Sequence, residues 1–207
     1  MIVIGVLGGI ASGKSVVTEQ LRTLGAEVLD VDRIGHDVLL MAEVKRQIRK
    51  RWGDEVFGGN GEVVRQRLAN IVFDPEQPAE LTALESITHP PIESLIRANI
   101  RKIRERNPLA LVLDAPVMVK TGWYRLCDLL LFVDCPAEAR LRRALSRGWT
   151  AEMLAAREAS QADVAEKQKL ATHLVSNQGT LEQLNETVRQ FWNSAIGPAG
   201  PARVETG

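Results

Sequence analysis

The sequence has few cysteines and no group of histidines that is spaced to bind a metal ion. Its 207 residues include only two cysteines, Cys127 and Cys135, and neither belongs to a Cys-x-x-Cys pair. This excludes a disulfide framework, and both thiols stand beside apolar residues where a small hydrophobic side chain would pack. The three histidines, His36, His89 and His173, are scattered without the spacing of metal ligands. We therefore expect reduced thiols in or near the core and no His/Cys metal centre.

Net charge and long apolar runs are also missing. Twenty-six basic residues balance 26 acidic ones, so nothing at the level of the whole chain favours nucleic acid or an anionic membrane. No apolar run approaches membrane-spanning length, and residues 1–7 lack the basic flank and long apolar core of a secretion signal. We expect a cytoplasmic monomer that has no nucleic-acid or membrane partner and whose anion site is local.

A phosphate-loop pattern stands at the start of the chain. Residues 8–15 read Gly-Gly-Ile-Ala-Ser-Gly-Lys-Ser, directly after a strand-like run at residues 2–7. Glycines allow a tight backbone whose N–H groups converge on one anion, and the helix that begins near Gly13 adds its positive dipole end. Lys14 would reach the outer phosphates, and the Ser15 hydroxyl would contact Mg²⁺. The alternative is a glycine-rich turn without a ligand, but strand, loop and amphipathic helix occur in the required order.

The remaining apolar runs predict an α/β fold. Near-continuous apolar strands that alternate with helices are typical of a parallel sheet covered on both faces. We therefore predict a doubly wound, five-stranded parallel sheet. Its expected strands are residues 2–7, 26–32, 109–113, 129–133 and 174–175.

Helical periodicity without strands predicts two additions to this core. The first is a helical acceptor-binding lobe inserted at residues 33–108, and the second is a mobile helical lid at residues 137–169. We expect one domain over residues 1–193, with a tail at 194–207 that is too rich in Gly, Pro and Ala to be ordered. The core would comprise 1–32, 109–136 and 170–193, and the lobe helices are expected at 38–52, 65–73, 78–87 and 91–106.

Carboxylates follow the predicted strands at the edge where parallel sheets bind ligands. Strand alternation would place Asp30 and Asp32 on one face, with Asp32 nearest the edge and suited to accept a proton from an attacking hydroxyl. The alternatives are that Asp32 caps a helix opening at Arg33, with Asp30 as the base. Asp114 ends the third strand, where it could hold Mg²⁺ or merely cap a turn.

Arginines of the lid are candidates for neutralising phosphoryl charge. Arg143 and Arg147 are the two that we select, and we expect most other lid charges to form a solvated face. His89, before Pro90-Pro91, could contact a substrate in the lobe or be buried at a helix junction.

Together these residues resemble one family, the dephospho-CoA kinases. The resemblance covers residues 2 to about 192 and rests on the order of the motifs more than on the phosphate loop. The matching segments are residues 8–15, Leu29-Asp30-Val31-Asp32, Arg65 with Val72-Phe73, Leu84-Glu85 with His89-Pro90, Asp114-Ala115-Pro116, Thr121-Gly122-Trp123, Val133-Asp134, and Asn177 with Gly179.

The resemblance implies ATP-dependent phosphorylation of the ribose 3′-hydroxyl of dephospho-CoA, the last step of coenzyme A synthesis. Asp32, Lys14 and Arg147 would be catalytic, and Mg²⁺ would lie on Ser15 and Asp114. The implied acceptor-binding residues are Asp32, Arg65, His89, Asp114 and Gly122. The implied ATP-binding residues are Gly9, Ile10, Ala11, Ser12, Gly13, Lys14, Ser15, Val16 and Arg143.

Some positions depart from the family pattern, and other functions stay open. Ala11 replaces a usual glycine and needs a backbone without positive φ to avoid strain. Lys120 and Ala69 also differ from the pattern, which affects the expected affinity and rate rather than the reaction. A nucleoside or nucleotide monophosphate kinase shares the core and would be separated by acceptor screening. A GTPase-type switch is the third hypothesis, but the chain has no Asn-Lys-x-Asp segment for guanine.

Overall fold

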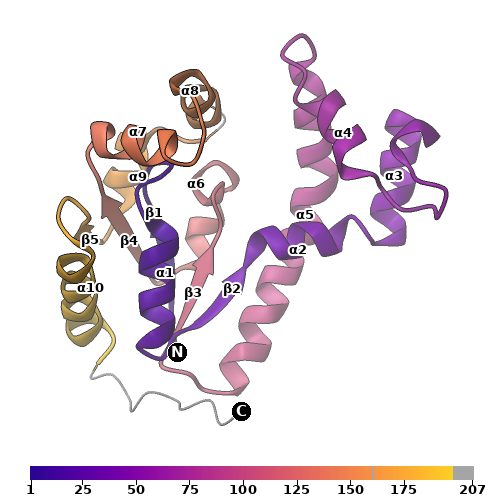
Figure 1. Cartoon of the computed structure of the whole chain (residues 1–207). Helices are drawn as coiled ribbons and strands as arrows, with labels where there is room; N and C mark the ends of the chain where they lie inside the picture. The colour runs from indigo at the N-terminus through magenta and orange to yellow at the C-terminus, as the bar shows by residue number, and fades with distance from the viewer. Residues whose placement is uncertain (160, 198–207) are drawn as a thin grey trace. The chain divides into compact units, whose positions relative to one another are not determined.

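The computed structural model, which describes residues 1–159 and 161–197, contains a parallel five-stranded sheet (Figure 1). The strand order is β2-β3-β1-β4-β5, and all four pairings are parallel. This confirms the doubly wound fold and all five strands. Their bounds are β1 Ile2–Leu7, β2 Glu27–Asp30, β3 Ala110–Asp114, β4 Leu129–Asp134 and β5 His173–Ser176.

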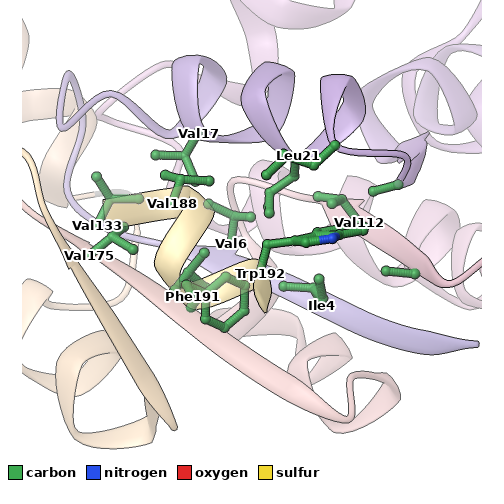
Figure 2. Close-up of a cluster of buried hydrophobic side chains, with 14 of the residues drawn as sticks. Ile4, Val6, Val17, Leu21, Val112, Val133, Val175, Val188, Phe191 and Trp192 are labelled. Atoms are coloured by element: carbon green, nitrogen blue, oxygen red, sulfur yellow. The ribbon is translucent and has the colours of Figure 1, made fainter. Parts of the chain in front are cut away.

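One face of the sheet packs against two helices, α1 (Lys14–Thr23) and α10 (Leu181–Ala195), which contact each other. The helices contribute apolar residues at helical spacing, and the strands contribute alternate residues, so the two sets interdigitate. These residues form a cluster of buried apolar side chains, and Figure 2 shows Trp192 of α10 in its middle. The side chain of Trp192 is fully buried. The core thus fixes the start of α1, where the phosphate loop ends.

The other face has close packing at Gly5. A Cβ at this position would lie 2.8 Å from the Met118 sulfur and 2.9 Å from that of Cys127. Met118 belongs to the short helix α6 (Met118–Thr121), which is followed by the 3₁₀ helix η2 (Trp123–Leu126). Burial raises the pKa of Cys127 to about 12, so this thiol stays protonated at neutral pH.

The predicted second strand is too long. β2 ends at Asp30, and helix α2 (Val31–Val38) begins at the next residue, so Asp32 lies in the first helical turn. Asp30 and Asp32 therefore do not alternate along one strand, and the prediction that they share a strand face is wrong. The predicted helix start at Arg33 is also wrong. Val31, Ile34 and Val38 are buried at helical spacing, and this apolar stripe explains the early start.

The described residues divide into two compact units. One contains the sheet and comprises residues 1–30 with the described part of 100–207; the other is Val31–Asn99, compared with the predicted lobe of 33–108. The second unit is helical. Its elements are α2, α3 (Ala42–Trp52), the 3₁₀ helix η1 (Asp54–Val56), α4 (Arg65–Val72) and most of α5 (Pro78–Glu105).

Two predicted helix boundaries in this region are wrong. The expected helix at 38–52 is split, because α2 ends at Val38 and α3 begins at Ala42. The expected break before Pro90-Pro91 does not occur, since α5 continues through both prolines. Residues 92, 96, 100 and 103 are buried isoleucines, so one apolar stripe continues beyond the prolines and stabilises the helix despite two missing N–H donors.

Three helices occupy the predicted lid: α7 (Ala137–Leu145), α8 (Ala151–Ala159) and α9 (Val164–Leu170). α10 reaches Ala195, two residues into the predicted tail, and residues 198–207 lie outside the described part. None of the helices in the described ranges has the length and apolar content that a membrane span requires.

Candidate active site

The phosphate loop joins β1 to α1 through a backbone that turns sharply at three positions. Gly8, Ala11 and Gly13 have φ values of 149°, 59° and 101°. Glycine adopts such conformations without steric cost, whereas Ala11 carries a Cβ in the left-handed region. The strain that the sequence predicted for a positive φ at Ala11 is therefore present. Because α1 begins at Lys14, the amide groups of Lys14 and Ser15 have no acceptor within the helix and can bind an anion.

The side chain of Lys14 folds back onto the backbone of the phosphate loop. Its Nζ donates to the carbonyl oxygens of Gly8 at 3.2 Å and Gly9 at 2.9 Å. Burial, and then the charge of Lys167, lower the pKa of Lys14 from 10.5 to about 8, although Asp114 acts in the opposite direction. A buried ammonium group with a lowered pKa is placed where additional negative charge would stabilise it.

Arg143 on α7 donates hydrogen bonds to the backbone of the phosphate loop. Its Nη1 donates to the carbonyl oxygen of Ser12 at 3.1 Å and, at 3.4 Å, to that of Ala11. Nη2 donates to Oδ1 of Asn177 at 3.1 Å, and Nδ2 of Asn177 donates to the same Ser12 oxygen at 2.6 Å. The predicted ATP-binding arginine thus contacts the loop backbone, which fixes the shape of the loop.

Arg140, one turn earlier on α7, lies against Gly9. A Cβ at Gly9 would stand 2.6 Å from Nη1 of Arg140, so a side chain at this position would require the guanidinium to move. Arg140 is 9% exposed and forms an ion pair with Glu158 of α8, while its Nε has no hydrogen-bond partner. Arg140 is therefore an exception to the expectation that most other lid charges form a solvated face.

Lys167 on α9 is a second buried lid cation, with only 4% of its surface exposed. Its Nζ donates to Oε1 of Gln161 at 2.8 Å. Burial lowers its pKa, Arg140 lowers it further, and Glu158 raises it. A cavity of about 270 Å³ separates this part of the lid from the loop, and Gly9, Ile10, Glu158, Gln161 and Lys167 are among its lining residues.

Two carboxylates meet at the carboxyl edge of the sheet. Asp30 of β2 is the register partner of Asp114 of β3, and Asp114 is near enough to Lys14 to affect its pKa. Ser15 is exposed at the start of α1. A hydroxyl and a carboxylate are hard oxygen donors of the kind that Mg²⁺ prefers, so Ser15 and Asp114 fit a magnesium ion carried by a nucleotide. In the described ranges, no three His, Cys, Asp or Glu side chains form a metal site.

The other predicted residues are distributed over both units. Asp32, Arg65 and His89 lie in the helical unit, where Nη1 of Arg65 is 2.6 Å from Nε2 of His36. His89 is inside α5 rather than at a helix junction. Val16 is 40% exposed at the start of α1. In the sheet unit, Arg147 is exposed after α7, and Gly122 has a φ of 79° between α6 and η2.

Sequence reasoning did not identify Arg140, Glu158 or Lys167 as site residues. For Arg140 a signal was available, because it precedes Arg143 by three positions and therefore shares its helix face. Glu158 and Lys167 belong to separate helices, and only the folded lid brings their charges together.

Comparisons with known proteins agree with this geometry. The model of a family described as dephospho-CoA kinase matches residues 2–183. The dephospho-CoA kinase of Dehalococcoides mccartyi is 34% identical over 190 residues, which cover 91% of this chain and 95% of the relative. That of Symbiobacterium thermophilum is 36% identical over 202 residues, or 97% of this chain and 84% of the relative.

Solved structures share the fold of this chain. A crystal structure from Thermus thermophilus has a TM-score of 0.77 and 31% identity, covering 95% of this chain and 98% of that one. The dephospho-CoA kinase of Campylobacter jejuni, at 24% identity and a TM-score of 0.72, shares the fold over 94% of this chain and 96% of its own. With the family model and relatives above 30% identity extending over most of the sequence, the chain belongs to the dephospho-CoA kinase family.

Proposed function

We propose that this protein transfers the γ-phosphoryl group of ATP to the ribose 3′-hydroxyl of dephospho-CoA, giving coenzyme A and ADP. The observation that carries the proposal is the phosphate loop, which holds a partly buried Lys14 in a chain that matches this family over residues 2–183. A polyphosphate would stabilise the ammonium group of Lys14, which contacts two carbonyl oxygens. The ammonium group would in turn supply the positioning and charge neutralisation on which phosphoryl transfer depends.

Asp32 is the proposed general base. The acceptor oxygen attacks the γ-phosphorus, the bond from that phosphorus to the β,γ-bridging oxygen breaks, and the hydroxyl proton passes to the Asp32 carboxylate. Asp32 follows Asp30 by two residues, which limits the separation of their Cα atoms to about 7 Å. The support is thus its place in the chain directly after the carboxyl end of β2.

The nucleotide contacts are proposed for residues 9–16 and Arg143, with Arg147 as a further cation at the transferred group. We assign the acceptor to Asp32, Arg65, His89, Asp114 and Gly122, of which Arg65 and His89 belong to the proposed acceptor-binding lobe of residues 33–108. We also propose that residues 137–169 form a lid. Ser15 and Asp114 would hold Mg²⁺, which neutralises charge on the phosphates when it is bound. We further propose a cytoplasmic monomer without a nucleic-acid partner, supported by the balanced charge of the chain.

The decisive assay mixes ATP and dephospho-CoA with the protein and detects coenzyme A by mass. Lys14→Ala is the control, because it keeps the chain but removes the phosphate-loop cation. A nucleotide monophosphate kinase would instead phosphorylate a nucleotide and leave dephospho-CoA unchanged, and that result would refute the proposal.

A second assay tests the base. Asp32→Asn should lower kcat by about 10²- to 10⁴-fold while ATP affinity stays within about twofold, because general-base catalysis contributes that much to the rate. Asp30→Asn is the matched variant on the neighbouring strand end. Full turnover by Asp32→Asn together with a large loss in Asp30→Asn would move the role to Asp30.

A further inference from the structure

Three cations from three different helices lie together at the phosphate loop. Lys14 begins α1, Arg140 lies on α7 and Lys167 on α9, and the charges of Arg140 and Lys167 both lower the pKa of Lys14. Lysine and arginine are almost never fully buried unless they are paired, yet Arg140 and Lys167 are 9% and 4% exposed. Their position therefore needs an anion.

One carboxylate acts on all three cations. Glu158 forms the ion pair with Arg140, and its charge raises the pKa of both Lys14 and Lys167. Asp114 also acts on Lys14, and Asp163 acts on Lys167. The hydrogen-bond acceptor that the structure gives to Nζ of Lys167 is neutral, the amide oxygen of Gln161. Burying an ammonium group against a neutral partner is costly, and an additional anion at Lys167 would offset that cost.

The cavity beside these residues has a size that suits the end of a polyphosphate. Its volume of about 270 Å³ is just below the ~300–1,000 Å³ that is typical of a whole small-molecule site. Gly9 and Ile10 of the loop line it together with Glu158, Gln161 and Lys167 of the lid. Glu158 thus lines the same space that an anion bound to the loop and to Lys167 would enter.

We propose that Lys167 binds the terminal phosphate of ATP and that Glu158 takes the place of that phosphate in the nucleotide-free protein. The inference rests on the proposed function in taking ATP as the ligand. A phosphate carries more charge and more acceptor oxygens than a carboxylate, so it competes with Glu158 for Lys167 and Arg140. The same cations therefore face an internal anion before binding and the substrate afterwards.

The first test is Lys167→Met, with Lys169→Met on the exposed side of the same helix as its matched control. Calorimetry should show ATP affinity about 10- to 100-fold lower in Lys167→Met and within twofold of the wild type in Lys169→Met. The affinity for ADP should fall much less than that for ATP, and Lys167→Arg should restore most of the loss. Equal losses for ATP and ADP would indicate a structural role only and would overturn the proposal.

The second test is Glu158→Gln, with Glu152→Gln as the exposed carboxylate of the same helix. Removing the internal competitor should tighten ATP binding at least threefold, whereas Glu152→Gln should leave it unchanged. Unchanged or weaker ATP binding in Glu158→Gln would contradict the proposal, and this variant decides the matter if Lys167→Met does not fold.

The two proposals fail in different ways. If the wild type binds ATP but does not phosphorylate dephospho-CoA, the proposed function is wrong and the binding comparisons still stand. If the wild type makes coenzyme A while Lys167→Met and Glu158→Gln bind ATP as it does, only the inference is wrong.

Discussion

Replacing Lys14 by methionine should abolish phosphoryl transfer and, at neutral pH, make the folded protein more stable. The reason is that the folded chain keeps this ammonium group charged in a buried place near two other cations. The difference between 10.5 and about 8, at about 1.4 kcal/mol per pKa unit, corresponds to a cost of about 3 kcal/mol for charged Lys14. Methionine has a similar length and carries no charge.

The net gain is smaller than this cost, because Lys14 also donates two hydrogen bonds to loop carbonyls. At about 1 kcal/mol each, their loss offsets about 2 kcal/mol. The remaining gain is about 1 kcal/mol, which raises Tm by roughly 2–4 °C in a domain of this size.

The sign of the effect should reverse with pH. Between pH 8 and 10.5 the folded protein binds fewer protons at Lys14 than the unfolded chain does, so the free energy of unfolding of the wild type rises with pH in this window. Lys14→Met lacks this rise. It should therefore be the more stable protein at pH 7 and the less stable one near pH 10, where the neutral amine of the wild type keeps its hydrogen bonds.

Urea unfolding of both proteins at pH 7 and pH 10 measures the difference directly, with exposed Lys50→Met as a control that should follow the wild type at both values. If Lys14→Met is less stable than the wild type by the same amount at pH 7 and pH 10, Lys14 carries no burial cost and the reasoning is refuted.

Three further substitutions, one of them with a matched control, test the loop and the core. Gly13→Ala should destabilise the folded protein by about 2–4 kcal/mol, because φ is 101° and the new Cβ would overlap Nδ2 of Asn177. The control is Gly148→Ala, where φ is 79° and the space around the glycine is open, and it should cost only about 1 kcal/mol in urea unfolding. Arg143→Lys should weaken ATP binding about tenfold in calorimetry, since one ammonium group cannot replace the fork that joins two loop carbonyls to Asn177; unchanged affinity would exclude the bracing role. Trp192→Ala should lower stability by about 3–5 kcal/mol in the same urea assay, and a loss below 1 kcal/mol would show that the cluster in Figure 2 repacks.

The three central strands, β1, β3 and β4, could be predicted because each is a short, nearly uninterrupted apolar run that is buried on both faces. The strand ends at Asp30, Asp114 and Asp134 mark one edge of the parallel sheet. The phosphate loop was predictable for a similar reason, since its glycines and its Lys-Ser pair are needed next to one another in the chain.

The errors arose where local signals competed with tertiary packing. Pro90-Pro91 is a strong local signal for a helix end, but the buried isoleucines that follow continue one helix through it. At Val31 the apolar pattern is compatible with strand and with helix, and only the packing of Ile34 and Val38 decides it. The role of Asp32 was inferred from strand alternation, so its support now rests on chain position and on the family.

The lid cations show why charge patterns are hard to interpret from sequence. Arg140, Glu158 and Lys167 are ordinary residues on amphipathic helices, and such charges are solvated in most proteins. Here three helices bring these charges together beside the phosphate loop, and the two cations are buried. Burial of each cation lowers the stability of the fold because the charge loses its hydration. A bound phosphate would remove this penalty, which would strengthen its binding. Glu158 limits the cost before binding, which lets the site hold three cations together without unfolding the lid.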